Sequence, residues 1–455
     1  MNAKIDFVNG KTSTGLLQMA VPLMIAMLLN MAYNLVDSIW IGNLLGENAM
    51  AALTNATPII LLLTSIGMGA TNGLAILLSQ AIGAKDDLKA KTILSTSLIS
   101  SVIFSLVLTV ICEFGMDEIL KLLKTPASIF PMAKDYISLY MLGFIAVYLY
   151  LYFTAVLRSY GNTKFQVLAI LSCTILNTVL DPFFIHMMGF RGAAVATLLS
   201  QFIALILMVC YIARKKLFSF SFSFVHWVEE KALLSKALPS VIQQSIPALS
   251  TSVLTSIVSG FGVTSIAAYG ITGKLETILF YPAMALNMAI TAIIGQCVGA
   301  GRLDRAKEYL KTSLIYSTGL LVVLSLFVVV FSGNLSHLFL NSTEAASIVK
   351  TYFLIVSVGY ILNTTTSCFT GTINGLGKPG MGMYLMIFYY ILVRMPLADL
   401  LSHTTLGLNG VWWAVLLSHG VAAVTAAFLA RVLLLRANKH RDDGLPNGPV
   451  NLKLG

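Results

Sequence analysis

Charged residues are scarce in this chain, and that scarcity indicates which solvent surrounds it. Of the 455 residues only 11% are charged, while 57% are hydrophobic and the mean hydropathy is +0.85. A soluble protein of this length needs roughly a quarter charged residues to cover its surface. Water therefore cannot be the main solvent, and we expect an integral membrane protein that has the lipid bilayer as its main partner.

Paired cysteines and enzyme signatures are also missing. The five cysteines stand far apart in or beside apolar runs, with no CxxC spacing, which argues against a disulfide framework or a metal site. We interpret all five as small packing residues. No nucleotide-binding loop, HExxH or GxSxG motif occurs, which argues against an ATPase or a protease. The sequence predicts a protein that is not an enzyme and needs no cofactor.

The positive net charge is explained by membrane topology and not by nucleic acid. The net charge is +10, but the Lys and Arg residues form short clusters between apolar runs, without a contiguous basic stripe. Crossing roughly 30 Å of hydrocarbon takes about 20 residues of helix. Twelve apolar runs of that length occur, near residues 16–41, 52–78, 92–112, 133–157, 167–187, 193–213, 239–260, 278–298, 312–331, 348–369, 383–401 and 411–434. The fold class is therefore all-α, with twelve transmembrane helices.

The distribution of basic residues predicts the orientation of these helices. With twelve spans, 22 basic residues lie on the side of the termini, 6 lie on the opposite side, and Arg394 lies inside a helix. Cytoplasmic loops carry the excess of Lys and Arg. We expect both termini in the cytoplasm and a multi-pass protein of the bacterial cell membrane. The first run is too long for the core of a signal peptide, so it stays as the first helix.

An internal repeat divides the chain into two related halves. Residues 79–99 and 295–315 are identical at ten of 21 aligned positions, at an offset of 216. Each half holds six spans, so the copies keep the same orientation and are related by an axis along the membrane normal. The predicted parts are a six-helix lobe at 1–220, a cytoplasmic connecting segment at 221–237, a second six-helix lobe at 238–436 and a disordered tail at 437–455.

Three charged residues remain deep inside the predicted spans, namely Asp37, Asp181 and Arg394. A charged side chain at the bilayer centre costs about 2.5 to 3.5 kcal/mol on insertion scales, so it normally faces protein or a wet cavity. The two acids are the candidates for ion coupling, with Asn177 beside them. The alternative is that both acids are neutral and hold helices together through hydrogen bonds.

Helical spacing places polar neighbours on the faces of both acids. Asn30, Tyr33 and Asn34 share a face with Asp37, as Thr174 and Asn177 do with Asp181. These residues and Arg394 are the predicted lining of a substrate cavity. A desolvated carboxylic acid can carry a proton through the cycle, and the carboxyl, amide and hydroxyl oxygens could instead surround a sodium ion. The sequence leaves the choice between proton and sodium open.

Two further positions each have two interpretations. Pro22 lacks an amide proton, so it is either a hinge of the first helix or a proline at the start of that helix. Arg394 precedes Met395 and Pro396, where it can bind freed carbonyls or pair with Asp399. His186, His403 and His419 are interpreted as interfacial residues at helix ends.

Four segments resemble the multidrug and toxic compound extrusion family, and the resemblance extends over nearly the whole chain. They are residues 22–53, residues 79–86, the NTVLDPFFI segment and the GQCVGAGRLDRA copy. Pro22 with Asp37, and Asn177 with Asp181, are similar to the DinF-like and MepA-like bacterial branches. The NorM-like branch carries further acids in spans seven and ten, which this sequence lacks.

The resemblance implies a proton- or sodium-coupled antiporter that exports cationic or amphipathic small organic compounds by alternating access, and we expect a monomer. A lipid-linked saccharide flippase of the same superfamily is the alternative. A flippase cavity needs several cationic residues for the pyrophosphate, whereas this chain offers two acids and one arginine.

Overall fold

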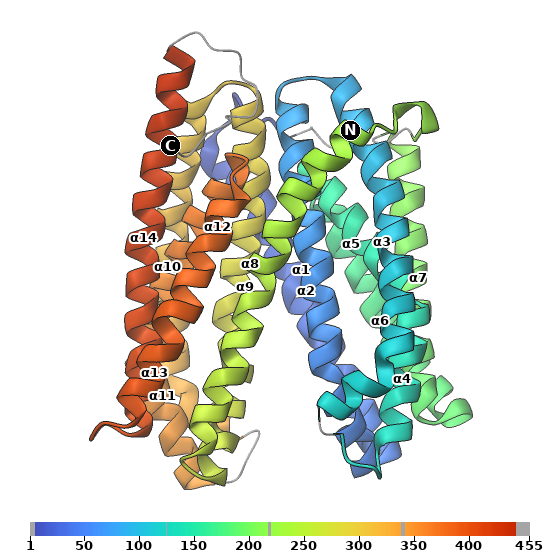
Figure 1. Cartoon of the computed structure of the whole chain (residues 1–455), viewed down its shortest axis with the longest axis vertical. Helices are drawn as coiled ribbons and strands as arrows, with labels where there is room; N and C mark the ends of the chain where they lie inside the picture. Colours follow the sequence, from blue (N-terminus) through green and yellow to red (C-terminus); the bar gives the residue numbers. More distant parts are fainter. Residues whose placement is uncertain (1–4, 124, 217–219, 338–341, 443–455) are drawn as a thin grey trace. The chain divides into compact units, whose positions relative to one another are not determined.

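The described part of the chain is helical throughout. The computed structural model describes residues 5–123, 125–216, 220–337 and 342–442, and these form helices joined by short turns, without a strand. Figure 1 follows the helices from the N-terminus in blue to the C-terminus in red. The prediction of an all-α fold is confirmed.

The predicted twelve spans are confirmed as well. Eleven helices in the described residues are long and apolar enough to cross a membrane, and the bent pair α4–α5 supplies a twelfth span. The first half contains α1 (Thr12–Leu45), α2 (Glu47–Gly83), α3 (Asp87–Leu122), α4 (Phe130–Leu142), α5 (Phe144–Ser159), α6 (Lys164–Met188) and α7 (Phe190–Arg214). The second half contains α8 (Trp227–Ser259), α9 (Val263–Gly299), α10 (Leu303–Ser336), α11 (Thr343–Gly375), α12 (Pro379–Met386), η2 (Ile387–Arg394), α13 (Met395–Ser402) and α14 (Leu408–Asp442).

Large apolar side chains remain on the outside of these helices, as a lipid environment requires. On α10, Val323, Leu326 and Val330 follow each other at helical spacing and are 62–65% exposed. An apolar stripe of this kind would destabilise a helix facing water, but it is the ordinary outer face of a membrane helix.

Several helices continue beyond the predicted apolar runs. The connecting segment at 221–237 contains the short helix η1 (Phe222–Phe224), and from Trp227 onward it is already part of α8. It is bonded to α3, because the backbone amide of His226 donates to Thr96 Oγ1 at 3.2 Å and Ser100 donates to Glu230. Helix α14 continues to Asp442, so the predicted disordered tail is helical up to that residue, and 443–455 lies outside the described residues.

Two interruptions of regular helix have local causes. The chain bends by 51° between α4 and α5 at Gly143, where an added Cβ would lie 2.3 Å from the Leu198 side chain. Thr109 on α3 donates to the Met141 carbonyl at 3.0 Å, next to this break. The second interruption is η2, a π-helical stretch of eight residues that ends directly before Met395 and Pro396. A proline cannot donate the backbone hydrogen bond that an α-helix needs there.

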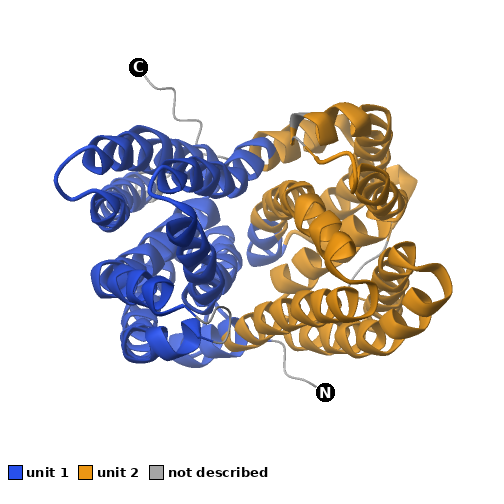
Figure 2. Cartoon of the chain, turned by 90° about the horizontal axis from the view of Figure 1, so that it is seen from below, with its two compact units in different colours: residues 1–20, 79–85, 238–455 blue, residues 21–78, 86–237 orange. Residues whose placement is uncertain are grey.

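The helices group into two compact units, coloured separately in Figure 2. Unit 2 contains residues 21–78 and 86–237, and unit 1 contains residues 1–20, 79–85 and 238–455. The start of α1 and the end of α2 therefore belong to unit 1 although they lie in the first half of the sequence. Helix α1 leaves unit 1 between Ala20 and Val21, directly before Pro22.

The two copies of the repeat meet inside unit 1. A Cβ added at Gly83 would lie 2.0 Å from the Gln296 carbonyl oxygen, and one added at Gly299 would lie 1.9 Å from the Gln80 carbonyl oxygen. Gln80 and Gly83 occupy the same repeat positions as Gln296 and Gly299. This reciprocal contact, in which each glycine admits the other copy's backbone, is expected of two copies related by a twofold axis.

Candidate ion-coupling site

Helix α1 places Tyr33 and Asp37 on one buried face of unit 2. Their exposed fractions are 6% and 7%, and they are one helical turn apart. The predicted stripe divides here, because Asn30 and Asn34 are exposed. Asn34 Nδ2 donates to the Asn30 carbonyl oxygen at 2.7 Å and to its side-chain oxygen at 3.1 Å. The two asparagines therefore bind each other and are not bonded to the buried acid.

Helix α6 supplies the second half of the site in the same unit. Asn177 and Asp181 are completely buried, and Asn177 Nδ2 donates to Asp181 Oδ1 at 2.8 Å. Pro182 follows Asp181 directly and removes one backbone donor from this turn of the helix. Thr174 donates to the Ile170 carbonyl at 2.9 Å on its own helix, so no hydrogen bond brings it to the acids.

The two acids interact directly with each other. The Asp37 and Asp181 side chains are neighbours within interaction range. Asp37 Oδ1, Asp181 Oδ2 and Asn177 Oδ1 are buried and accept no hydrogen bond from any described residue. Ionised carboxylates are acceptors only, so two of them in contact repel unless a proton or a cation lies between them. The arrangement is therefore suited to hold one positive charge.

Two residues beside this pair were not predicted. Tyr136 on α4 lies near both carboxyl groups, and its ring stacks on Phe190 with centroids 4.8 Å apart. Thr197 on α7 approaches the Tyr33 hydroxyl. Thr197 is the last residue of the GAAVAT motif, so this motif could have pointed to it. Nothing in the sequence distinguishes Tyr136 from the other tyrosines of its span.

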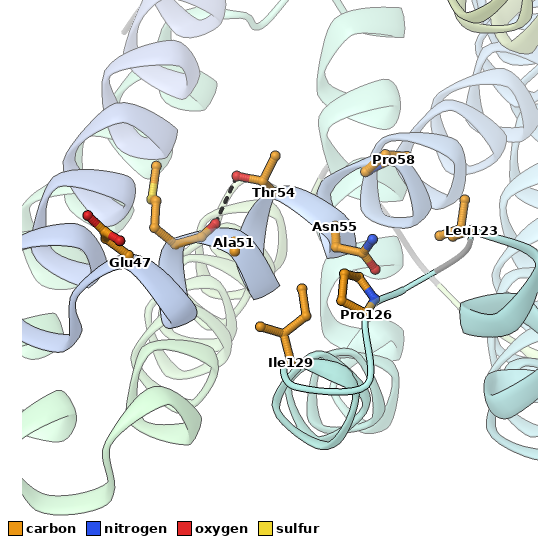
Figure 3. Close-up of a pocket in the computed structure, with 9 residues that line it drawn as sticks. Glu47, Ala51, Thr54, Asn55, Pro58, Leu123, Pro126 and Ile129 are labelled. Atoms are coloured by element: carbon orange, nitrogen blue, oxygen red, sulfur yellow. Dashed lines mark hydrogen bonds between the residues drawn. The ribbon is translucent and has the colours of Figure 1, made fainter.

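A separate pocket of about 660 Å³ opens in unit 2 at the start of α2, shown in Figure 3. Thr54 in its wall donates to the Met50 carbonyl at 2.8 Å. Glu47 is the titratable residue of the lining, and neither Asp37 nor Asp181 belongs to it. The lining residues are Glu47, Met50, Ala51, Thr54, Asn55, Pro58, Leu123, Pro126 and Ile129. This pocket is distinct from the carboxyl pair.

Arg394 lies in unit 1 at the end of η2 and is 7% exposed. Its Nε donates to Ser418 Oγ at 2.9 Å, and its NH2 group contacts His419 Nε2 at 3.1 Å and donates to the Tyr389 hydroxyl. The expected alternative of a pair with Asp399 is wrong, because Asp399 lies on the exposed side of α13 beside His403.

The interpretation of His419 as interfacial is also wrong. His419 lies well inside α14 and is 1% exposed. It is a hydrogen-bonding partner of Arg394, because the polar faces of η2 and α14 meet inside the bundle.

The structure adds a membrane acid that the sequence analysis left out. The predicted eighth span began at residue 278, but α9 begins at Val263, so Glu276 lies inside that helix. Tyr352 and Tyr360 on α11 both donate to Glu276 Oε1. The statement that three charges remain inside the spans is therefore wrong. Because Lys274 and Glu276 are charged, the apolar run that defined the span began only after them, and the start of the helix was missed.

Known proteins are similar to this chain over most of its length. The model of the MatE family matches residues 22–183 and 239–400, one match in each half, and the two matches begin at Pro22 and Pro239. A probable multidrug resistance protein, YpnP of Bacillus subtilis, is 29% identical over 93% of this chain and 96% of that protein. The multidrug export protein MepA of Staphylococcus haemolyticus is 26% identical over 91% of this chain and 92% of that protein.

A solved structure has the same fold. It is described as the outward-facing conformation of a multidrug resistance MATE family transporter, with a TM-score of 0.91, 22% identity, and coverage of 96% of this chain and 99% of that chain. The family model itself covers most of the sequence, in two copies that coincide with the internal repeat. The chain therefore belongs to the MatE family, the multidrug and toxic compound extrusion transporters.

Proposed function

We propose that this protein is a cation-coupled antiporter that exports cationic or amphipathic organic compounds by alternating access. The observation that carries the proposal is the contact between Asp37 and Asp181, two buried carboxyl groups that need a positive charge between them. A site of this kind binds one positive charge at a time. A proton or sodium ion and a cationic compound can then occupy it alternately.

The roles of the individual residues follow from their positions. Asp37 and Asp181 carry the exchangeable charge, and Asn177 orients Asp181 through its amide donor while its own oxygen remains available. Tyr33 and Tyr136, the buried tyrosines beside the acids, place hydroxyl groups close to them. A proton satisfies the pair as one O–H···O hydrogen bond, and a sodium ion would use the carboxyl and amide oxygens instead.

Pro22 is the proposed hinge of α1. It lies ten residues after Thr12, where the helix begins, so the alternative of a helix-start proline does not apply. The missing backbone hydrogen bond lowers the cost of bending the helix at this turn. Asp37, about four turns further along the same helix, would feel that bend as a change of position.

We expect both termini on the cytoplasmic side of the cell membrane and a monomeric transporter. The distribution of basic residues, 22 against 6, supports this orientation. The relatives named as multidrug resistance or export proteins favour organic compounds as substrates over the flippase alternative.

The test is transport in proteoliposomes with an imposed pH gradient or an imposed sodium gradient. Uptake of a lipophilic cation such as tetraphenylphosphonium into vesicles by wild-type protein should follow one of the two gradients. Asp37→Asn keeps the size of the side chain but removes its exchangeable charge, so it should fold and fail to respond to either gradient. Uptake by the wild type that ignored both gradients would refute cation coupling.

A further inference from the structure

Unit 1 contains a polar cluster of its own, centred on Glu276. The carboxyl oxygen Oε1 accepts from the hydroxyls of Tyr352 and Tyr360, which lie two helical turns apart on one face of α11. The two hydroxyl oxygens are 3.2 Å from each other. Tyr352 and Tyr360 are fully buried, while Glu276 is only partly buried. The acid is therefore bonded to α11 on one side, and part of its surface stays uncovered by the protein.

Glu276 lies inside the long helix α9, on the part that leads into the hydrocarbon. Helix α9 has 37 residues, so it is roughly 56 Å long and exceeds the roughly 30 Å of hydrocarbon. Glu276 lies thirteen residues after Val263, or roughly 20 Å along the helix. An acid in the interior of a membrane helix is normally a functional residue with a named partner.

Arg394 is the opposite charge in this cluster. It interacts electrostatically with Glu276 without forming an ion pair, since the structure gives it Ser418, Tyr389 and His419 as hydrogen-bonding partners. The guanidinium also lies over the rings of Tyr389 and Tyr390, at 4.7 Å from each centroid. All of these partners are neutral.

Hydrogen bonding fixes the protonation state of His419. Arginine is only a donor, so His419 Nε2 must accept from it, and the ring proton then lies on Nδ1, which faces the Tyr389 hydroxyl at 2.6 Å. A second proton on Nε2 would break the contact with Arg394 and place two positive groups together. Arg394 therefore keeps a fixed charge, and Glu276 is the member of the cluster whose charge can change.

We propose that Glu276 is a second proton-exchanging carboxyl group of the transport cycle, positioned by Tyr352 and Tyr360 and balanced by Arg394. The inference rests on the antiport function proposed above. The titratable groups around Glu276 are Tyr352 and Tyr360 on α11, Arg394, Tyr389 and Tyr390 on η2, Tyr269 on α9 itself and His419 on α14.

The proton step follows from the hydrogen bonds. Oε1 already accepts from two hydroxyls, so a hydronium ion transfers its proton to the other carboxyl oxygen, Oε2, which forms the O–H bond and leaves a water molecule. The cluster then changes from neutral to a net charge of +1, because Arg394 loses its counter-charge. The added positive charge repels a cationic compound close to the cluster. Proton uptake therefore favours release of the compound, as export requires.

The experiment compares Glu276→Gln with a surface control, Glu344→Gln at the exposed start of α11. Glutamine keeps an oxygen that accepts from both tyrosines, so a purely structural role of Glu276 is preserved in this variant. The readout is the maximal accumulation of tetraphenylphosphonium in proteoliposomes at several imposed pH gradients. If one proton fewer is exchanged per transported cation, the ratio of inside to outside tetraphenylphosphonium falls about tenfold per pH unit of gradient. We expect that drop for Glu276→Gln and not for the control.

Accumulation by Glu276→Gln equal to that of the wild type would overturn the inference, while leaving the antiport proposal intact. Absence of gradient-driven accumulation in the wild type would instead refute the antiport proposal. If Glu276→Gln does not fold, the double variant Asp37→Asn/Asp181→Asn provides the second measurement. With occupancy measured by equilibrium dialysis, tetraphenylphosphonium bound to this variant in weakly buffered detergent solution should still release protons from Glu276, and either no binding or binding without release would overturn the inference.

Discussion

The two polar clusters of the molecule balance their charges in different ways. In unit 2 two acids face each other, and the Asn177 amide donates to one of them, so the pair lacks a positive charge. In unit 1 one acid has two hydroxyl donors and a nearby arginine, so charge is already compensated. Two halves that share an internal repeat thus contain polar clusters with different electrostatics. We therefore propose that the first cluster takes up a cation, whereas the second can lose its compensation.

The largest expected effect concerns the pair in unit 2. Asp37→Asn and Asp181→Asn should each reduce gradient-driven export to background, because either change leaves a single acid that no longer shares a charge. The double variant should be no worse than either single variant, since residues acting as one unit are not additive. Export is measured in proteoliposomes that contain equal amounts of protein.

Asp135→Asn is the matched control, because Asp135 is an exposed acid of the same unit that pairs with Arg191 at 2.7 Å. It should export at the wild-type rate. If either single variant kept gradient-driven export well above background while the double variant lost it, the acids would act separately and the comparison between clusters would fail.

The next effect concerns the contact between the two repeat copies. Gly299→Ala should destabilise the protein by several kcal/mol or prevent folding, because its Cβ would lie 1.9 Å from the Gln80 carbonyl oxygen and backbone must move. Gly319→Ala on α10, where nothing lies within 4 Å of the added Cβ, should be neutral or slightly stabilising. Thermal unfolding in detergent measures both, and equal midpoints for the two variants would contradict the close crossing.

A smaller effect concerns the balance of charge between Arg394 and Glu276 in unit 1. Arg394→Met leaves Glu276 without its nearby positive charge and removes the donor that bonds Ser418, Tyr389 and His419, so it should destabilise the unit by about 1 to 3 kcal/mol. Adding Glu276→Gln to it should recover part of that loss, because the uncompensated acid is removed. No recovery in the double variant would mean that the two charges are energetically independent.

The smallest effect distinguishes the two copies of the repeat loop. Lys85 has a positive φ of 56°, and at the equivalent position of the second copy Gly301 has a φ of 71°. A side chain costs about 1 kcal/mol in this conformation, so Lys85→Gly should raise the unfolding midpoint slightly. Gly301→Ala should lower it. A lower midpoint for Lys85→Gly would show that the Lys85 side chain contributes more than its strain costs.

Most of the fold was predictable, because apolar length and period are physical requirements of the bilayer. All twelve spans occur where the runs lie, but their ends were misjudged wherever charged residues continue a helix past the hydrocarbon. The start of α9 shows this best, since Lys274 and Glu276 interrupted the run that defined the span. That one boundary error hid the acid of the second cluster.

The candidate site was predictable in part. Intramembrane acids are rare, so Asp37 and Asp181 stood out, and helical spacing gave Asn177 as the neighbour of Asp181. Spacing could not tell which side of a polar stripe is buried, so Asn30, Asn34 and Thr174 were grouped with the acids although the structure does not bond them to the pair. Tyr136 comes from another helix, and its position depends on tertiary packing that one sequence does not contain.

The most direct test of the shared charge is proton release on substrate binding. Purified wild-type protein in weakly buffered, sodium-free detergent solution receives tetraphenylphosphonium, and the pH change is compared with that of Asp37→Asn. If the pair of Asp37 and Asp181 holds an exchangeable proton, the wild type releases more protons than the variant at equal occupancy. Equal release by both proteins, with no sodium displaced when the experiment is repeated in sodium, would contradict the account.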